Sequence, residues 1–241
     1  AFSAVHKSSL AAPQWIAEQG LDCYEYQCGK GVHVGEDTAR RVGENARKHG
    51  ISLSLHAPYF INLANPDPDS LQKAIGYITS ACLVASQMGA SRVVIHSGAL
   101  MKRTRREALD TALRSLREVI RTCDGQGFGH IALCPETMGK LNQLGDLEEV
   151  LGFCELDERF TPCIDFGHLN SRTHGGLEEP GAYEAVLDAI SNRLGEERGK
   201  RFHMHFSKIE YSAGGEKVHL TFESAAFGPD PAPLMALLAR R

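Results

Sequence analysis

The sequence lacks the excess of positive charge that marks proteins whose whole surface binds nucleic acid. Its 241 residues include 26 Lys and Arg against 30 Asp and Glu, a formal net charge of -4. A basic footprint over the whole surface is therefore excluded, although local clusters such as Lys102–Arg106 remain. No apolar run approaches the ~20 residues of a membrane-spanning helix and no secretory signal is visible, so we expect no membrane association.

Closely paired cysteines are missing as well. None of the seven cysteines forms a C-x-x-C pair, and their number is odd. This usage is typical of reduced thiols in a cytoplasmic protein. Hydrophobic residues make up 42% of the chain, and no linker rich in proline or serine interrupts it. We therefore expect one domain over residues 1–241, and a monomer.

Short apolar runs alternate with amphipathic segments along the chain. The expected strands are Asp22–Gln27, Ile51–His56, Arg92–His96, His130–Glu136, Thr161–Asp165 and Phe202–Phe206. The expected helices are Glu36–His49, Ser70–Met88, Thr104–Thr122, Asp146–Cys154 and Pro180–Glu197, with a helix-like end at Leu234–Arg241. This alternation predicts an α/β protein with a mostly parallel sheet.

A glycine-rich phosphate loop after the first strand is absent, which counts against an open dinucleotide-binding sheet. The run Gly125–Gly129 precedes a strand and is interpreted as a turn. A (β/α)8 TIM barrel is the favoured fold, with an open sheet as the alternative. Because such a barrel needs eight strands and six are visible, its first and last strands are expected to lie outside this sequence.

Metal-type ligands follow one another at the carboxyl ends of the expected strands. Five consecutive strands end on or near such a residue: His56, His96, Glu136, Asp165 and His205. In a β/α barrel these ends share one face, where active sites lie. Imidazoles and carboxylates are preferred ligands of zinc and related divalent metals. The pattern therefore predicts a metal site on this face.

Further histidines lie near these strand ends. His168 follows Asp165 closely, and His219 ends a segment, Ile209–His219, that we expect to form a long loop or hairpin around Gly214 and Gly215. His203 shares a strand face with His205 and is a weaker candidate. The remaining histidines are interpreted as structural or incidental.

Taken together, these motifs resemble a known family. The matching segments are His56–Tyr59 with Asn62, His96–Gly98, Pro135–Thr137, Cys163–Asp165 with His168, and Met204–His205. In order and spacing they are similar to the signature series of endonuclease IV, a zinc-dependent apurinic/apyrimidinic endonuclease with a (β/α)8 barrel. The resemblance extends over nearly the whole chain.

The resemblance implies a site with two or three zinc ions, and Mn²⁺ or Mg²⁺ is less favoured. One zinc would be held by His56, His96 and Glu136, with Glu136 bridging to the others as the central catalytic residue. Asp165 and His205 would help to hold a second zinc, and His168 and His219 a third. The resemblance also implies abasic-site DNA as the partner, a role in base excision repair, and substrate contacts from Tyr59, Asn62 and Asn142.

The sequence departs from the family pattern in three places. Lys217 stands where the family has a ligand Asp two positions before His219, and it is expected to oppose a third zinc. Ser207 and Lys208 replace an Asn-Asp pair. No last strand is present to supply a further ligand Glu. These departures favour a non-catalytic family member as one alternative. An isomerase or epimerase of sugars that uses Mn²⁺ or Mg²⁺ is another, because related barrels also place Glu, Asp and His at strand ends.

Overall fold

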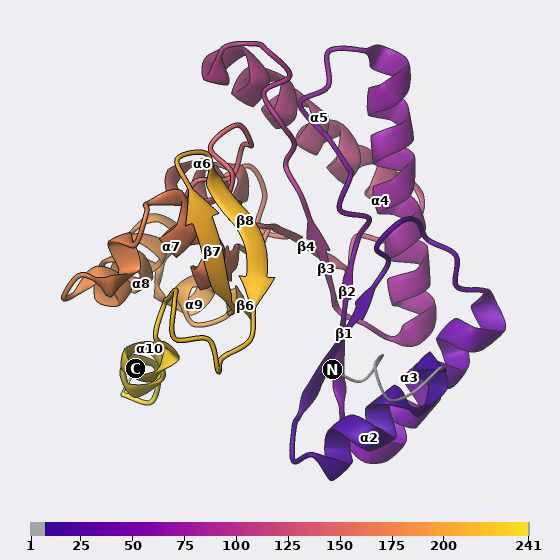
Figure 1. Ribbon diagram of the computed structural model, residues 1–241. Helices are drawn as coiled ribbons and strands as arrows, with labels where there is room; N and C mark the ends of the chain where they lie inside the picture. Colours follow the sequence, from indigo (N-terminus) through magenta and orange to yellow (C-terminus); the bar gives the residue numbers. More distant parts are fainter. Residues whose placement is uncertain (1–7, 241) are drawn as a thin grey trace.

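The computed structural model describes residues 8–240 and contains a parallel sheet (Figure 1). Its strands are β1 (Cys23–Gln27), β2 (Ser52–His56), β3 (Arg92–Ile95), β4 (Ala132–Pro135), β5 (Cys163–Asp165) and β6 (His203–His205). Neighbours pair in parallel from β1 to β4 and from β5 to β6. Parallel bridges from Leu133 to Phe160 and from Glu136 to Cys163 connect the two parts. The six expected strands are confirmed, with ends that differ by one or a few residues.

Helices follow the strands as the alternation predicts. They are α2 (Ala12–Glu18), α3 (Glu36–His49), α4 (Pro68–Met88), α5 (Arg105–Gly125), α6 (Leu147–Cys154), α7 (Phe166–Arg172), α8 (Ala182–Leu194), α9 (Glu196–Gly199) and α10 (Pro231–Leu238). Thr104 and Asp146 form capping boxes that begin α5 and α6. The expected helix Pro180–Glu197 is shorter, because Gly195 interrupts it and α9 follows. No helix between residues 8 and 240 is long and apolar enough to cross a membrane.

The sheet curls so that its distant strands approach each other. The Arg92 guanidinium at the start of β3 donates to the Arg201 carbonyl just before β6, at 2.9 Å. Glu25 of β1 contacts His203 of β6, at 2.8 Å. Six of the eight strands of a barrel are present among the described residues. The last two strands, β7 (Lys208–Ser212) and β8 (Gly215–Leu220), pair antiparallel as the expected hairpin.

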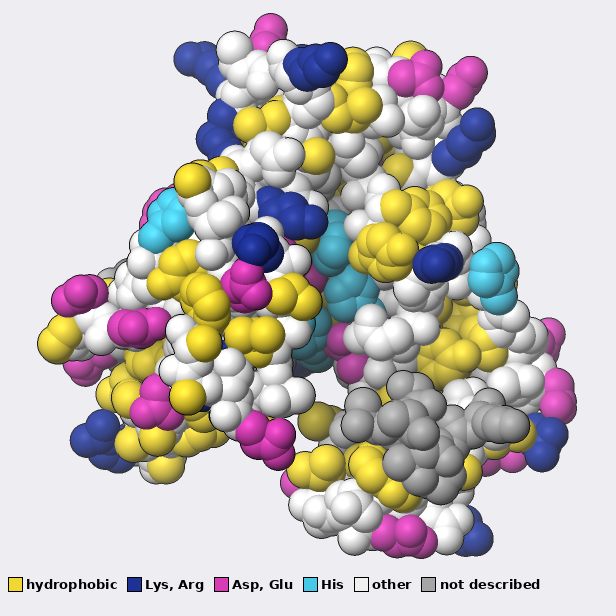
Figure 2. Space-filling view, in the orientation of Figure 1, with side chains coloured by type: hydrophobic (Ala, Val, Ile, Leu, Met, Phe, Trp, Pro, Cys, Tyr) yellow, Lys and Arg dark blue, Asp and Glu magenta, His cyan; other side chains and the backbone are white. Residues whose placement is uncertain are grey.

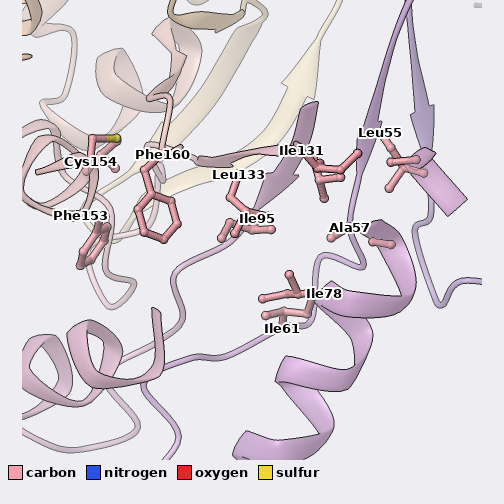
Figure 3. Close-up of a cluster of buried hydrophobic side chains, with 14 of the residues drawn as sticks. Leu55, Ala57, Ile61, Ile78, Ile95, Ile131, Leu133, Phe153, Cys154 and Phe160 are labelled. Atoms are coloured by element: carbon pink, nitrogen blue, oxygen red, sulfur yellow. The ribbon is translucent and has the colours of Figure 1, made fainter. Parts of the chain in front are cut away.

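Buried apolar side chains fill the space between the strands and their helices. Leu55, Ile95 and Leu133 come from neighbouring strands, and Ile78 of α4 and Phe153 of α6 cover them (Figure 3). All five side chains are at most 3% exposed. Burying a side chain of this size contributes about 1.5–3 kcal/mol. The core therefore holds the strands in register, and with them the residues at their carboxyl ends.

Helices α3 and α4 lie on the side of β1–β4 away from the β7–β8 hairpin (Figure 1). They approach closely because Gly43 of α3 has no side chain. A Cβ atom at this position would lie 2.1 Å from the Met88 carbonyl oxygen, which no packed structure tolerates. Gly76 of α4 is also within a helix, but a Cβ atom there would meet nothing within 4 Å. A side chain at position 43 would therefore push the two helices apart, whereas a methyl group at position 76 would meet no neighbour.

We expect Gly43→Ala to lower the free energy of unfolding by about 1–3 kcal/mol, because α3 and α4 would have to separate. Gly76→Ala should raise it by about 0.5–1 kcal/mol, because alanine favours a helix interior and nothing obstructs it. Urea denaturation of both variants measures the difference. Equal effects of the two substitutions would contradict the close packing of the helices.

Candidate metal centre

The strand-end residues surround a cavity of about 610 Å³ at the carboxyl ends of the barrel strands. Figure 2 shows histidines gathered in a hollow on this face, with Lys and Arg side chains beside them. A larger cavity of about 830 Å³ lies against α8 and α10. Its lining includes no histidine and none of the strand-end carboxylates, so the chemistry predicted from the sequence belongs to the smaller cavity.

Glu136 is the centre of this arrangement. Its Oε2 atom lies 3.2 Å from His56 Nε2 and 3.1 Å from His96 Nε2. Its Oε1 atom lies 2.8 Å from His205 Nδ1. The residue directly follows β4, and its backbone N–H donates to the Ile95 carbonyl at 3.0 Å. One carboxylate is therefore shared by side chains from β2, β6 and the residue after β3.

The charge of Glu136 is stabilised although the residue is only 2% exposed. Burial by itself would raise the pKa of the carboxyl group. Hydrogen bonds from His205, His56 and His96 outweigh burial and hold this pKa well below its usual range. The pKa of His56 is raised in turn, since contact with Glu136 outweighs the loss of solvation. The site is thus arranged for an anion surrounded by positive charge.

Backbone carbonyl groups orient three of the histidines in the same way. The Nδ1 atom of His56 lies 2.7 Å from the Ala57 oxygen, and that of His96 lies 2.8 Å from the Tyr59 oxygen. His168 Nδ1 lies 2.8 Å from the Thr137 oxygen. A carbonyl oxygen only accepts, so each Nδ1 carries the proton. Each Nε2 is therefore left to face the carboxylates or a metal ion.

Ligand-type atoms form four groups, each with all three atoms within 4.8 Å of one another. One group is Cys163, His203 and His205, and the other three, called the donor sets below, consist of the expected ligands and Glu216. The first donor set is His56, His96 and Glu136, the second is Glu136, Asp165 and His205, and the third is His168, Glu216 and His219. Each donor set combines imidazole and carboxylate ligands, which suit a divalent metal. The structure thus brings together all seven metal ligands expected from the sequence and adds Glu216.

Glu216 was not predicted, and it corrects the expectation for Lys217. In the hairpin, Glu210 pairs with Val218 and Tyr211 pairs with Glu216, so Lys217 forms a β-bulge. A bulge reverses the alternation of a strand, and it therefore brings Glu216 to the side of His219. The two Glu216 oxygens lie 3.6 Å from His168 Nε2 and 3.6 Å from His219 Nε2. Lys217 is exposed and pairs with Glu210, so it does not oppose the third donor set.

Glu25 is a second residue that sequence reasoning missed. It lies in β1 between Tyr24 and Tyr26 and lines the cavity. It contacts His203, which was only a weak candidate, and also His205 Nε2 at 3.0 Å. The signal in the sequence was a carboxylate between two tyrosines of a strand, but Glu25 does not lie at the strand end.

The predicted substrate residues differ in their positions. Tyr59 lines the cavity and is 52% exposed. The Asn62 side-chain oxygen accepts from the backbone N–H groups of Ala64 and Ala99, at 3.0 and 3.1 Å. Asn62 therefore organises a turn and does not line the cavity. Asn142 is exposed, and its neighbour Gln143 lines the cavity instead.

Sequence comparison finds relatives that cover different shares of the chain. An uncharacterized protein of Methanocaldococcus jannaschii is 31% identical over 212 residues, which are 88% of this chain and 76% of the relative. A probable endonuclease 4 of Mycoplasma pneumoniae is 31% identical over 169 residues, 67% of this chain. The match covers only 56% of that endonuclease, and the rest of its length is not aligned with this chain.

Solved structures with the same fold have names of two kinds. A D-tagatose 3-epimerase-like protein superposes with a TM-score of 0.67 and 22% identity, over 85% of this chain and 76% of its own. Endonuclease IV from Thermus thermophilus superposes with a TM-score of 0.58 and 20% identity, over 79% and 68% of the two chains. At this identity the likeness establishes the fold alone. Residues 13–240 match a family model described as a xylose isomerase-like TIM barrel, and the chain therefore belongs to that family.

Proposed function

We propose that the protein is a zinc-dependent hydrolase that cleaves DNA phosphodiester bonds at abasic sites. The observation that carries this proposal is the sharing of Glu136 between two donor sets, with a third donor set beside them. Such an arrangement suits a cluster of metal ions rather than one ion. The likeness to a probable endonuclease 4 over 67% of the chain supports the same reading.

The chemistry of the donor sets fits zinc better than magnesium or manganese. Five of the eight donors are imidazoles, and only three are carboxylates. Imidazole is a typical ligand of zinc, whereas magnesium and manganese favour oxygen ligands. When bound, clustered zinc ions would lower the pKa of a water molecule and neutralise charge on a phosphate. The donor residues and their backbone partners would hold these ions in place.

The protein residues around the cavity would orient the substrate. Arg172 donates from Nη1 to the carbonyl oxygens of Met138 and Lys140, at 3.1 and 2.8 Å. Arg105 donates from Nη2 to the Leu141 carbonyl at 2.6 Å. These contacts hold the 140–145 segment at the edge of the cavity, and the Lys140 side chain lines the cavity itself. A lysine at this edge would attract a phosphate.

Tyr59, which lines the cavity, belongs to a group of exposed aromatic side chains. The ring centroid of Phe60 is 6.1 Å from that of Tyr59 and 5.0 Å from that of Tyr77. All three side chains are at least 39% exposed. Exposed aromatic rings are suited to contact unstacked nucleotides. An abasic nucleotide is cheap to extrude from a duplex because it has no base pair to lose.

An epimerase of sugars is the alternative. The second donor set alone, with two carboxylates and one imidazole, would suffice for a site with one metal ion. Such an enzyme would leave the first and third donor sets without a role. Because the bulge at Lys217 brings Glu216 specifically to the third donor set, we favour the hydrolase.

Two or three zinc ions per chain are expected after purification in zinc-containing buffer, measured by elemental analysis. The same sample should incise a duplex at a single tetrahydrofuran abasic analogue and leave the undamaged duplex intact. Glu136→Gln should remove most of this activity, because it leaves two donor sets without their shared anion. One manganese ion per chain together with turnover of a ketose would instead support the epimerase.

Glu216→Gln should lower the zinc content by about one ion per chain. The third donor set would then lose its only carboxylate. Lys217→Gln is the matched control, because it changes the neighbouring residue and removes only an exposed ion pair with Glu210. Equilibrium dialysis followed by elemental analysis compares the two variants. A loss of zinc in Lys217→Gln but not in Glu216→Gln would refute the assignment of Glu216 to the third donor set.

Zinc binding should release protons near neutral pH and should tighten as the pH rises. The pKa of His56 is raised by Glu136 against the effect of burial, and that of His219 is raised by Glu216. These imidazoles therefore bind protons in the metal-free protein and must lose them to bind zinc. Glu136 is already ionised and contributes no proton. Calorimetry in buffers of different ionisation enthalpy counts the protons released on zinc binding. Proton uptake on zinc binding would contradict this prediction.

A further inference from the structure

Glu25 accepts hydrogen bonds from four side chains although it lies outside the three donor sets. His203 Nε2 is 2.8 Å from Oε2, and His205 Nε2 is 3.0 Å from Oε1. Gln27 Nε2 donates to Oε1 at 2.9 Å, and Ser54 Oγ donates to Oε2 at 3.3 Å. The side chain is only 17% exposed. A carboxylate so fully hydrogen-bonded is held in one orientation.

His205 is oriented in the opposite sense to three other histidines of the centre. His56, His96 and His168 each direct Nδ1 to a backbone carbonyl and Nε2 to the carboxylates. His205 instead directs Nδ1 to Glu136, at 2.8 Å, and Nε2 to Glu25. Its acceptor is therefore a side chain on another strand. Without that acceptor, nothing described at Nε2 would select one tautomer of the ring.

We propose that Glu25 is a positioning residue of the second donor set. It accepts the Nε2 proton of His205 and leaves Nδ1 as the atom that faces Glu136 and a metal ion. His203 donates to the second oxygen of Glu25 and keeps the carboxylate turned toward His205. This inference rests on the proposed occupancy of the donor sets by zinc.

The role follows from general properties of metal-bound imidazole. A carboxylate partner on the second ring nitrogen fixes the tautomer and increases the basicity of the ligand. Loss of such a partner typically weakens metal binding by about 10–100-fold. Glu25 also connects β1 with β6, two strands that form no backbone pair with each other among the described residues. A single side chain therefore links the geometry of the second donor set to the curl of the sheet.

The first test is zinc affinity in Glu25→Gln. A glutamine has one acceptor oxygen, and its NH₂ group would face one of the two histidine N–H groups. We expect one zinc ion per chain to bind about 10–100-fold more weakly, with the other sites unchanged. Competition with a chromophoric chelator measures each affinity. Glu44→Gln, an exposed carboxylate of α3, is the matched control and should behave as the unaltered protein.

The second test uses the unaltered protein and so does not depend on the folding of a variant. In the zinc-loaded protein, long-range ¹H–¹⁵N correlation spectra of the histidine rings identify the protonated nitrogen. We expect His205 to be protonated at Nε2 and bound to metal at Nδ1. Metal bound at Nε2 would overturn the proposal, as would a Glu25→Gln variant whose zinc affinities all equal those of the unaltered protein. Unaltered protein that binds no zinc would refute the hydrolase proposal as well.

Discussion

The need to stabilise one buried anion connects most features of this site. Glu136 is almost inaccessible to water, and an isolated charge there would be strongly unfavourable. Three imidazoles within 3.2 Å supply the compensation, and each comes from a different part of the barrel. Imidazoles around a carboxylate are also a ready set of metal ligands. The same contacts therefore explain both the low pKa of Glu136 and the capacity of the centre to hold cations.

The barrel supports this arrangement by fixing where each strand ends. Parallel strands direct their carboxyl ends to one face, and the buried core beneath them sets their register. The backbone completes the site, because the carbonyl oxygens of Ala57, Tyr59 and Thr137 orient three imidazoles. Within residues 8–240, His205 has no such carbonyl partner, and its Nε2 atom contacts Glu25 instead. The centre thus relies on the backbone for three of its five histidines, on the Ser207 hydroxyl for His219 and on a second carboxylate for His205.

Much of this could be predicted from the sequence, since local patterns mark strand ends. His56, His96, Glu136, Asp165 and His205 follow apolar runs, and the structure brings them together as expected. Other features depend on tertiary contacts and strand irregularities that the spacing of residues along the sequence does not reveal. Strict alternation along the strand would place the Lys217 side chain beside His219. The bulge at Lys217 places the Glu216 side chain there instead. Glu25 of β1 reaches His203 and His205 of β6 only because the sheet curls.

Asn62 illustrates a different limit of sequence reasoning. The family resemblance implied a contact of Asn62 with substrate, but its side-chain oxygen accepts from two backbone N–H groups in a turn. A residue of a sequence motif can therefore serve to stabilise a loop and make no contact with substrate. Gly98 has the same character, since a Cβ atom there would lie 2.1 Å from the Asn62 oxygen. These two residues therefore fix the shape of the loop that follows His56 and His96.

The sharing of Glu136 between metal ions is the central claim, and anomalous diffraction at the zinc absorption edge tests it most directly. Crystals grown with zinc should show three anomalous peaks in the cavity, two of them within ligand distance of Glu136. The third should lie among His168, Glu216 and His219. A single peak at the second donor set, with none at His56 and His96, would contradict the account.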